Sequence, residues 1–138
     1  MIEQRTIVPA DAAELPALVQ VLQSFWTAQN LPPAQVLTFE LALEEVFLNV
    51  VMHGAPAGPL PRIEVTLALV GHDLTMTVED TGPHFDPTAL PPPDVTASAA
   101  SRPVGGLGVF LVRQMMDAVS YERIGERNRL RMTKYLPA

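Results

Sequence analysis

Two hydrophobic periods alternate along the chain and divide it into helical and extended segments. Apolar residues recur every three to four positions in some segments, a pattern typical of amphipathic helices. These helices are expected over residues 12–29, 33–53 and 109–117. Apolar and polar residues alternate in other segments, which predicts half-buried strands. The strands are expected over residues 2–8, 62–70, 73–80, 118–124 and 128–136.

Glycines separate several of these segments and indicate how they connect. Gly71 and His72 join two alternating runs, which predicts a β-hairpin. Gly125 predicts a second turn, between the last two strands. The order of elements does not follow a doubly wound Rossmann pattern and suits an α+β sandwich, with helices packed on one face of a sheet. We expect a single domain over residues 1–138, because one domain usually takes about 100–200 residues.

Residues 86–102, with the sequence DPTALPPPDVTASAASR, show neither period. Three consecutive prolines are followed by a tail rich in alanine, serine and threonine. Unstructured loops of this length are uncommon inside small domains and are usually functional, often as lids. We therefore expect a functional loop between the hairpin and the third helix.

Composition excludes several classes of protein. The chain holds 15 acidic residues against nine lysines and arginines, for a net charge of −6, so it lacks the basic face of a nucleic-acid binder or a polybasic membrane anchor. It has no cysteine, which excludes disulfides, zinc–thiolate sites and thiol catalysis. No apolar stretch is long enough for a membrane span, and the N-terminus lacks the pattern of a signal peptide. We expect a cytoplasmic protein.

Three polar residues interrupt the apolar second half of the second helix. Asn49 lies between the apolar runs Val46–Leu48 and Val50–Met52, and a buried amide without partners costs about 1–3 kcal/mol. Glu45 precedes it by one helical turn and His53 follows it by one turn, so all three side chains project to the same side. This stripe is a candidate site, although the same spacing also suits a polar strip that faces solvent.

Two further segments have residues suited to binding a ligand. Asp80 ends a strand and is followed by Gly82, so a carboxylate can meet a ligand donor where the backbone approaches closely. An ordinary strand-to-loop turn uses the same residue types. The glycine-rich segment 105–108 opens a helix, and its backbone N–H groups can hold an anion at the positive end of the helix dipole. It is not a Walker motif, because no Gly-Lys-Ser/Thr follows.

The order of these segments is more specific than any one of them. E-x-x-x-N on a helix, D-x-G at a strand end, a long loop and G-G-x-G before a helix follow one another in a single small domain. This order resembles the N, G1 and G2 boxes of the GHKL ATPase superfamily. Within it, EEVFLNVVMHG, DTGPHFDP and GGLGVFLVRQMMDAVSYER look most like the anti-sigma-factor serine/threonine protein kinases.

This resemblance implies a fold and a role for most of the candidate residues. The fold would be the histidine-kinase-like two-layer sandwich, a mixed sheet with helices on one face and an ATP lid over residues 86–104. Asn49 would ligate the Mg²⁺ that bridges the ATP phosphates, and Glu45 would be the general base. Asp80 would accept a hydrogen bond from the adenine amino group. Gly82 would let the adjacent backbone turn, and His53 would line the site.

The remaining implied roles fall in the lid and on the last strand. The hinge of the lid and the start of the phosphate-binding helix would be Gly105, Gly106, Leu107 and Gly108. Arg102, within the lid, would reach the γ-phosphate. Asn128 falls where many family members have a threonine that helps to bind adenine through water. The chain departs from the family at Pro83-His84, where a second glycine is common, and at Arg127-Asn128, which replaces Gly-Thr.

The function implied is that of a kinase in a partner-switching system. Such a protein binds ATP and Mg²⁺, phosphorylates a serine or threonine of an anti-anti-sigma (STAS-domain) protein, and sequesters a sigma factor or another regulatory target. The acidic balance suits protein partners and not nucleic acid, and the resemblance suggests a homodimer in which the first strand adds to a sheet edge. One alternative is a nucleotide-gated binding regulator without kinase activity. Another is the catalytic domain of a split histidine kinase, which the lack of a long phospho-accepting helix disfavours.

Overall fold

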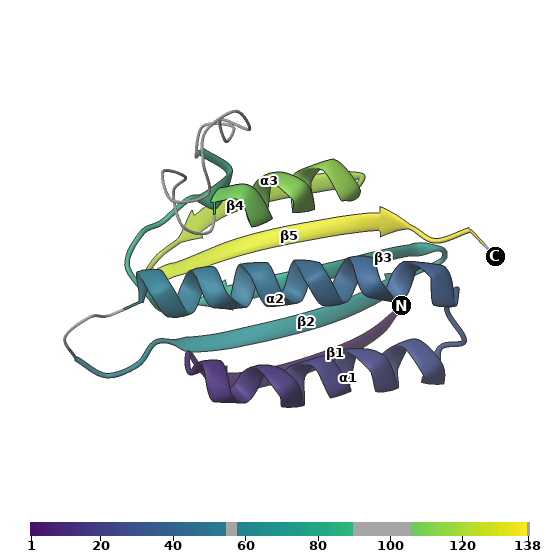
Figure 1. The fold of residues 1–138 in the computed structure, drawn as a ribbon, viewed down its shortest axis with the longest axis horizontal. Helices are drawn as coiled ribbons and strands as arrows, with labels where there is room; N and C mark the ends of the chain where they lie inside the picture. The colour runs from purple at the N-terminus through teal and green to yellow at the C-terminus, as the bar shows by residue number, and fades with distance from the viewer. Residues whose placement is uncertain (55–57, 90–105, 138) are drawn as a thin grey trace.

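The computed structural model describes residues 1–54, 58–89 and 106–137. Each helix and strand expected from the hydrophobic periods is present, with ends that move by at most a few residues (Figure 1). The strands are β1 (Ile2–Pro9), β2 (Arg62–Val70), β3 (Asp73–Asp80), β4 (Ala118–Ile124) and β5 (Arg127–Tyr135). The helices are α1 (Leu15–Ala28), α2 (Val36–His53) and α3 (Gly106–Met115). No helix in the described ranges is long and apolar enough to cross a membrane.

The strands form one sheet in the order β1-β2-β3-β5-β4, and each pair of neighbours is antiparallel. The α+β sandwich is confirmed, but the expectation of a mixed sheet is wrong. The chain crosses from β3 through α3 to β4, so β3 and β4 run in the same direction. However, β5 lies between them, and the described strands form no parallel pair. A tight turn at Gly71 (φ 61°) joins β2 to β3, and another at Gly125 (φ 58°) joins β4 to β5, as the glycines predicted.

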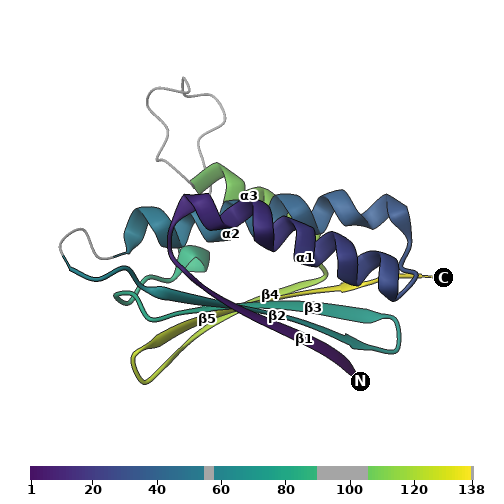
Figure 2. The same ribbon diagram turned by 90° about the horizontal axis from the view of Figure 1, so that it is seen from below.

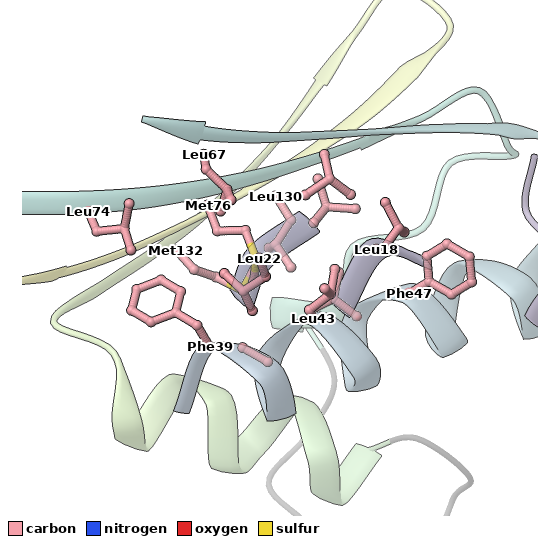
Figure 3. Packing of buried hydrophobic residues seen from close by; sticks show 14 of the residues in the cluster. Leu18, Leu22, Phe39, Leu43, Phe47, Leu67, Leu74, Met76, Leu130 and Met132 are labelled. Atoms are coloured by element: carbon pink, nitrogen blue, oxygen red, sulfur yellow. The ribbon is translucent and has the colours of Figure 1, made fainter. Parts of the chain in front are cut away.

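The helices cover one face of the sheet and enclose the core between the two layers (Figure 2). Alternate residues of the strands point toward the helices, as the period of two requires. Phe39 and Phe47 of α2 are fully buried against them. Figure 3 shows this packing, in which side chains from the sheet and from α1 and α2 meet: Leu18, Leu22, Phe39, Leu43, Phe47, Leu67, Leu74, Met76, Leu130 and Met132. The second half of α2 is buried on more than one side because α1 and α3 both contact this helix.

The opposite face of the sheet carries cross-strand ion pairs. Arg129 of β5 bonds to Glu79 of β3 and reaches Glu122 of β4 at 3.3 Å. Arg5 of β1 lies 3.1 Å from Glu64 of β2. Such surface pairs contribute little, about 0–1 kcal/mol each. The functional candidates lie on the helix-covered face, at the end of the sheet where β3 ends, β5 begins and α2 terminates.

Candidate functional site

An open cavity lies between the C-terminal half of α2 and the adjoining ends of β3 and β5. Its volume is about 410 Å³, including space continuous with solvent. Four of the candidate residues line it, namely Asn49, His53, Asp80 and Asn128. The rest of the wall is mostly apolar: Val46, Val50, Val78, Pro83, Phe85, Pro87, Tyr121 and Leu130. Segments far apart in the sequence therefore build one cavity.

Asn49 reaches this cavity from the helix α2 and is only 4% exposed. Val46, one helical turn before it, and the adjacent Val50 also line the cavity, so the amide of Asn49 lies in an apolar wall. Neither Oδ1 nor Nδ2 has a hydrogen-bond partner or reaches solvent among the residues described. A buried amide without partners is costly. Its oxygen is a hard ligand suited to Mg²⁺.

Glu45 lies one helical turn before Asn49 and outside the lining of the cavity. It is half-buried. Burial raises the pKa of the Glu45 carboxyl, and the neighbouring charge of Glu44 raises it further. A carboxylate with a raised pKa is better suited to accept a proton near neutral pH. The helical stripe expected from the sequence thus places two of its three members in the cavity and the third beside it.

Asp80, the last residue of β3, is 7% exposed and lines the cavity. Its Oδ1 accepts the backbone N–H of Gly82 at 2.9 Å and the side-chain N–H of Asn128 at 3.0 Å. Burial raises the pKa of the Asp80 carboxyl, while these two hydrogen bonds and the charge of Arg123 oppose the rise. No described residue donates to Oδ2. This oxygen remains available to accept a hydrogen bond from a ligand.

A glycine is needed at position 82 because there is no room for a Cβ atom, and not because the backbone adopts a left-handed conformation. A Cβ atom at this position would lie 2.9 Å from Oδ1 of Asp80, closer than real Cβ contacts allow. The carboxylate is short, buried and held by two hydrogen bonds, so it has little room to yield. The resemblance implies that Gly82 lets the adjacent backbone turn. In the structure it also leaves room for the aspartate.

Asn128 begins the part of β5 that faces Asp80, and the two residues are paired in the sheet register. Its Nδ2 donates to Oδ1 of Asp80 and, at 2.8 Å, to the carbonyl oxygen of Pro83. Its Oδ1 accepts hydrogen bonds from three groups, which are the Tyr121 hydroxyl, the Arg123 guanidinium and the Phe85 backbone N–H. With 5% exposure, this amide is fully engaged by protein groups. It joins β5, β4 and the segment after β3.

His53, the last residue of α2, stacks on Phe85 with ring centroids 4.0 Å apart and planes 16° from parallel. Both rings line the cavity. The stack joins the end of the helix to the segment after β3. His53 therefore lines the cavity, and its ring contacts the ring of Phe85.

The glycine-rich segment and the lid are described in part. Gly106, Leu107 and Gly108 form the first turn of α3, so the helix begins three residues earlier than the hydrophobic pattern predicts. Of the expected lid, residues 86–89 are described and contain a short turn in which Asp86 Oδ1 accepts the backbone N–H of Thr88 at 2.8 Å. Arg102 and Gly105 lie outside the described residues, as does the rest of the lid.

The sequence alone missed Tyr121, Arg123 and Phe85. Tyr121 and Arg123 alternate with exposed residues on β4, so both point to the helix-covered face. Arg123 donates to the carbonyl oxygen of Gly82 at 2.9 Å as well as to Asn128. An arginine at an inward position of a strand indicates a polar network. However, its partners, Gly82 and Asn128, are 41 and five residues away in the sequence, so only the fold identifies them.

Three comparisons with known proteins identify the family of this chain. The chain matches the family described as the histidine kinase-like ATPase domain over residues 8–134. It is 31% identical over 98 residues to the serine/threonine-protein kinase BtrW of Bordetella bronchiseptica, covering 71% of this chain and 69% of that protein. The crystal structure of the RsbU and RsbW domains of a Mycobacterium tuberculosis protein matches with a TM-score of 0.71 at 15% identity.

The structural match covers 100% of this chain and 34% of the mycobacterial chain, so the present chain spans about a third of it. At that identity the likeness concerns the fold alone, whereas the family match extends over nearly the whole sequence. The resemblance to the GHKL ATPases expected from the three boxes is therefore confirmed. The chain belongs to the histidine kinase-like ATPase domain family.

Proposed function

We propose that the cavity binds ATP together with Mg²⁺. The observation that supports this most directly is the amide of Asn49, which is buried without a hydrogen-bond partner among the described residues. Burial of an unpartnered polar group is unfavourable, and a bound ligand that interacts with the amide would explain it. The amide oxygen of Asn49 would hold Mg²⁺. When bound, the ion neutralises charge on the phosphates. The N-terminal turn of α3, which begins at Gly106, supplies backbone N–H groups for the same phosphates.

The adenine would lie on the apolar wall beside Asp80. The unused Oδ2 of Asp80 accepts a hydrogen bond from the exocyclic amino group. The valines of α2 and β3 contact the purine, and the stacked pair of His53 and Phe85 borders the site. A largely apolar cavity with one well-placed acceptor is the usual design of a site for a flat heterocycle.

The finer proposal is a serine/threonine protein kinase of a partner-switching system. The hydroxyl oxygen of the substrate attacks the γ-phosphorus, the bond from the γ-phosphorus to the β,γ-bridging oxygen breaks, and ADP leaves. Glu45 takes the hydroxyl proton, a role that its raised pKa favours. Arg102 is proposed to stabilise charge on the transferred group. The proposed substrate is an anti-anti-sigma (STAS-domain) protein, and the proposed sequestered partner is a sigma factor.

The test combines a binding and a transfer measurement. Wild-type protein should bind ATP in calorimetry only when Mg²⁺ is present, and it should transfer labelled phosphate from ATP to a STAS-domain protein. Glu45→Gln should keep ATP binding and lose transfer, while Glu40→Gln on the same helix should retain both. Binding that is independent of Mg²⁺ and of Asn49 would contradict the proposed site.

The alternative is a nucleotide-gated regulator that binds its partner without phosphorylating it. It uses the same cavity, so ATP binding does not separate the two functions. Phosphate transfer does. If wild-type protein binds ATP and retains a STAS-domain or sigma partner, but labels none of them, the regulator is the correct function and the kinase proposal fails.

A further inference from the structure

The buried amide of Asn128 has no hydrogen-bonding capacity left for a ligand. An asparagine side chain offers two N–H donors and one oxygen. Both donors are used, by Asp80 and by the carbonyl oxygen of Pro83. The oxygen already accepts three hydrogen bonds. Asn128 lines the nucleotide cavity, yet its polar atoms are turned to protein groups.

The effect of this arrangement falls on the carboxylate of Asp80. Asn128 and Gly82 both bond to Oδ1, and no described group bonds to Oδ2. One oxygen is thereby fixed and the other is left for a ligand. Arg123 adds a second connection, since it donates to both the Asn128 oxygen and the carbonyl oxygen of Gly82. The two groups that bond to Asp80 are thus both held by the sheet: Asn128 belongs to β5, and Arg123 of β4 bonds to Asn128 and to Gly82.

We propose that Asn128 is the positioning residue for purine selection: without contacting the nucleotide, its amide holds Oδ1 of Asp80 so that Oδ2 meets the amino group of adenine. The proposal rests on the proposed ATP site and deepens it. An ionised carboxylate only accepts hydrogen bonds. Adenine presents an amino donor at its six position, whereas guanine presents an oxygen acceptor there. A fixed carboxylate therefore favours adenine and opposes guanine, and a loosened one discriminates less.

The experiment compares ATP with its 6-desamino analogue, purine riboside triphosphate, and with GTP. The dissociation constant of each is measured with Mg²⁺ for wild-type protein and for Asn128→Ala. The control is Thr133→Val, which removes the 2.9 Å hydrogen bond between Thr75 and Thr133. This variant loses a side-chain bond between the same two strands, β3 and β5, at a pair of residues remote from the cavity.

The wild type should bind ATP at least about tenfold more tightly than the desamino analogue, because a hydrogen bond to a charged group is lost. In Asn128→Ala this preference should shrink to about twofold or less, with ATP weakened and the analogue hardly changed. The preference for ATP over GTP should narrow as well. Thr133→Val should retain the wild-type preference.

The possible failures are distinguishable. If Asn128→Ala weakens ATP and the analogue by the same factor, Asn128 serves the fold alone and the inference is overturned. If wild-type protein binds none of the three nucleotides, the proposed function itself has failed. Should Asn128→Ala not fold, Asn128→Asp is measured instead. It keeps the acceptor oxygen but replaces the N–H donors that face Asp80 and Pro83, and its preference for ATP over the analogue must fall in the same way.

Discussion

Two asparagines, Asn49 and Asn128, are buried at the wall of the cavity. Asn49 is 4% exposed and Asn128 is 5% exposed, so burial does not distinguish them. Their hydrogen-bond partners distinguish them. The Asn49 amide has no partner in the described structure, whereas the Asn128 amide makes five hydrogen bonds. Replacing each with leucine should therefore change the stability of the nucleotide-free protein in opposite directions.

The magnitude follows from the cost of an unmade hydrogen bond. A buried polar group without partners costs about 1–3 kcal/mol, and an apolar replacement removes that cost. Leucine branches at Cγ as asparagine does and has the same number of side-chain heavy atoms, so it is a close apolar replacement for the amide. We expect Asn49→Leu to raise the free energy of unfolding by about 1–2 kcal/mol, which is roughly 3–8 °C in the melting temperature.

Asn128→Leu leaves buried donors and acceptors of Asp80, Pro83, Tyr121 and Arg123 without their partner. We expect it to lower the free energy of unfolding by about 3 kcal/mol or more, a large part of the ~5–15 kcal/mol that holds a domain together. The assay is urea unfolding without nucleotide, followed by calorimetric titration with Mg²⁺ and ATP. Asn49→Leu should be the more stable protein and should lose binding.

The reasoning would be refuted if Asn49→Leu destabilised the nucleotide-free protein by more than about 1 kcal/mol. The amide would then support the fold and would not be held for a ligand. Retention of wild-type affinity for ATP with Mg²⁺ in the same variant would refute the assigned role of Asn49 in binding. Asn128→Leu serves as the internal control. Its expected decrease in the free energy of unfolding shows that the assay detects the loss of a buried hydrogen-bond network.

Three further predictions concern the rest of the site. Gly82→Ala should weaken ATP binding by at least about tenfold while preserving the circular dichroism spectrum, because the new Cβ displaces Oδ1 of Asp80; unchanged affinity would contradict the tight contact. His53→Ala should weaken ATP by about two- to tenfold in calorimetry, because the stacked Phe85 loses its support, and equal affinities would remove the stack from the site. Glu44→Gln removes a charge that raises the pKa of the Glu45 carboxyl, so that pKa should fall. Since a general base is inactive when protonated, the loss of phosphate transfer on acidification should then occur at lower pH; a profile that does not move would exclude Glu45 as the base.

The sequence predicted the helices and strands because hydrophobic periods and hairpin turns depend on residues that are close together in the chain. Gly71 and Gly125 adopt the positive φ that hairpin turns use. Helical spacing also brought Asn49 and His53 to one cavity. The position of β5 between β3 and β4 is a matter of long-range pairing, which no local period encodes. The expectation of a mixed sheet was wrong for that reason.

The polar network of the site was not predictable from the sequence for a related reason. Asn128 bonds to Asp80 and Pro83, which precede it by 48 and 45 residues. Only the register of β3 against β5 brings these groups together, with Asp80 directly opposite Asn128. The resemblance implies that Asn128 falls where many family members have a threonine that helps to bind adenine through water. In the structure, the amide of Asn128 bonds to protein groups.

The two asparagines represent opposite uses of a buried amide within one cavity. Asn128 is satisfied by protein, so it adds rigidity and transmits that rigidity to Asp80. Asn49 is unsatisfied among the described residues, so the nucleotide-free protein bears a cost that a ligand can relieve. A ligand that binds only the native state stabilises it in proportion to the logarithm of its concentration over the dissociation constant. If an apolar side chain at position 49 is more stable but cannot bind, the asparagine is retained for the ligand, and function and stability are opposed at this single position of α2.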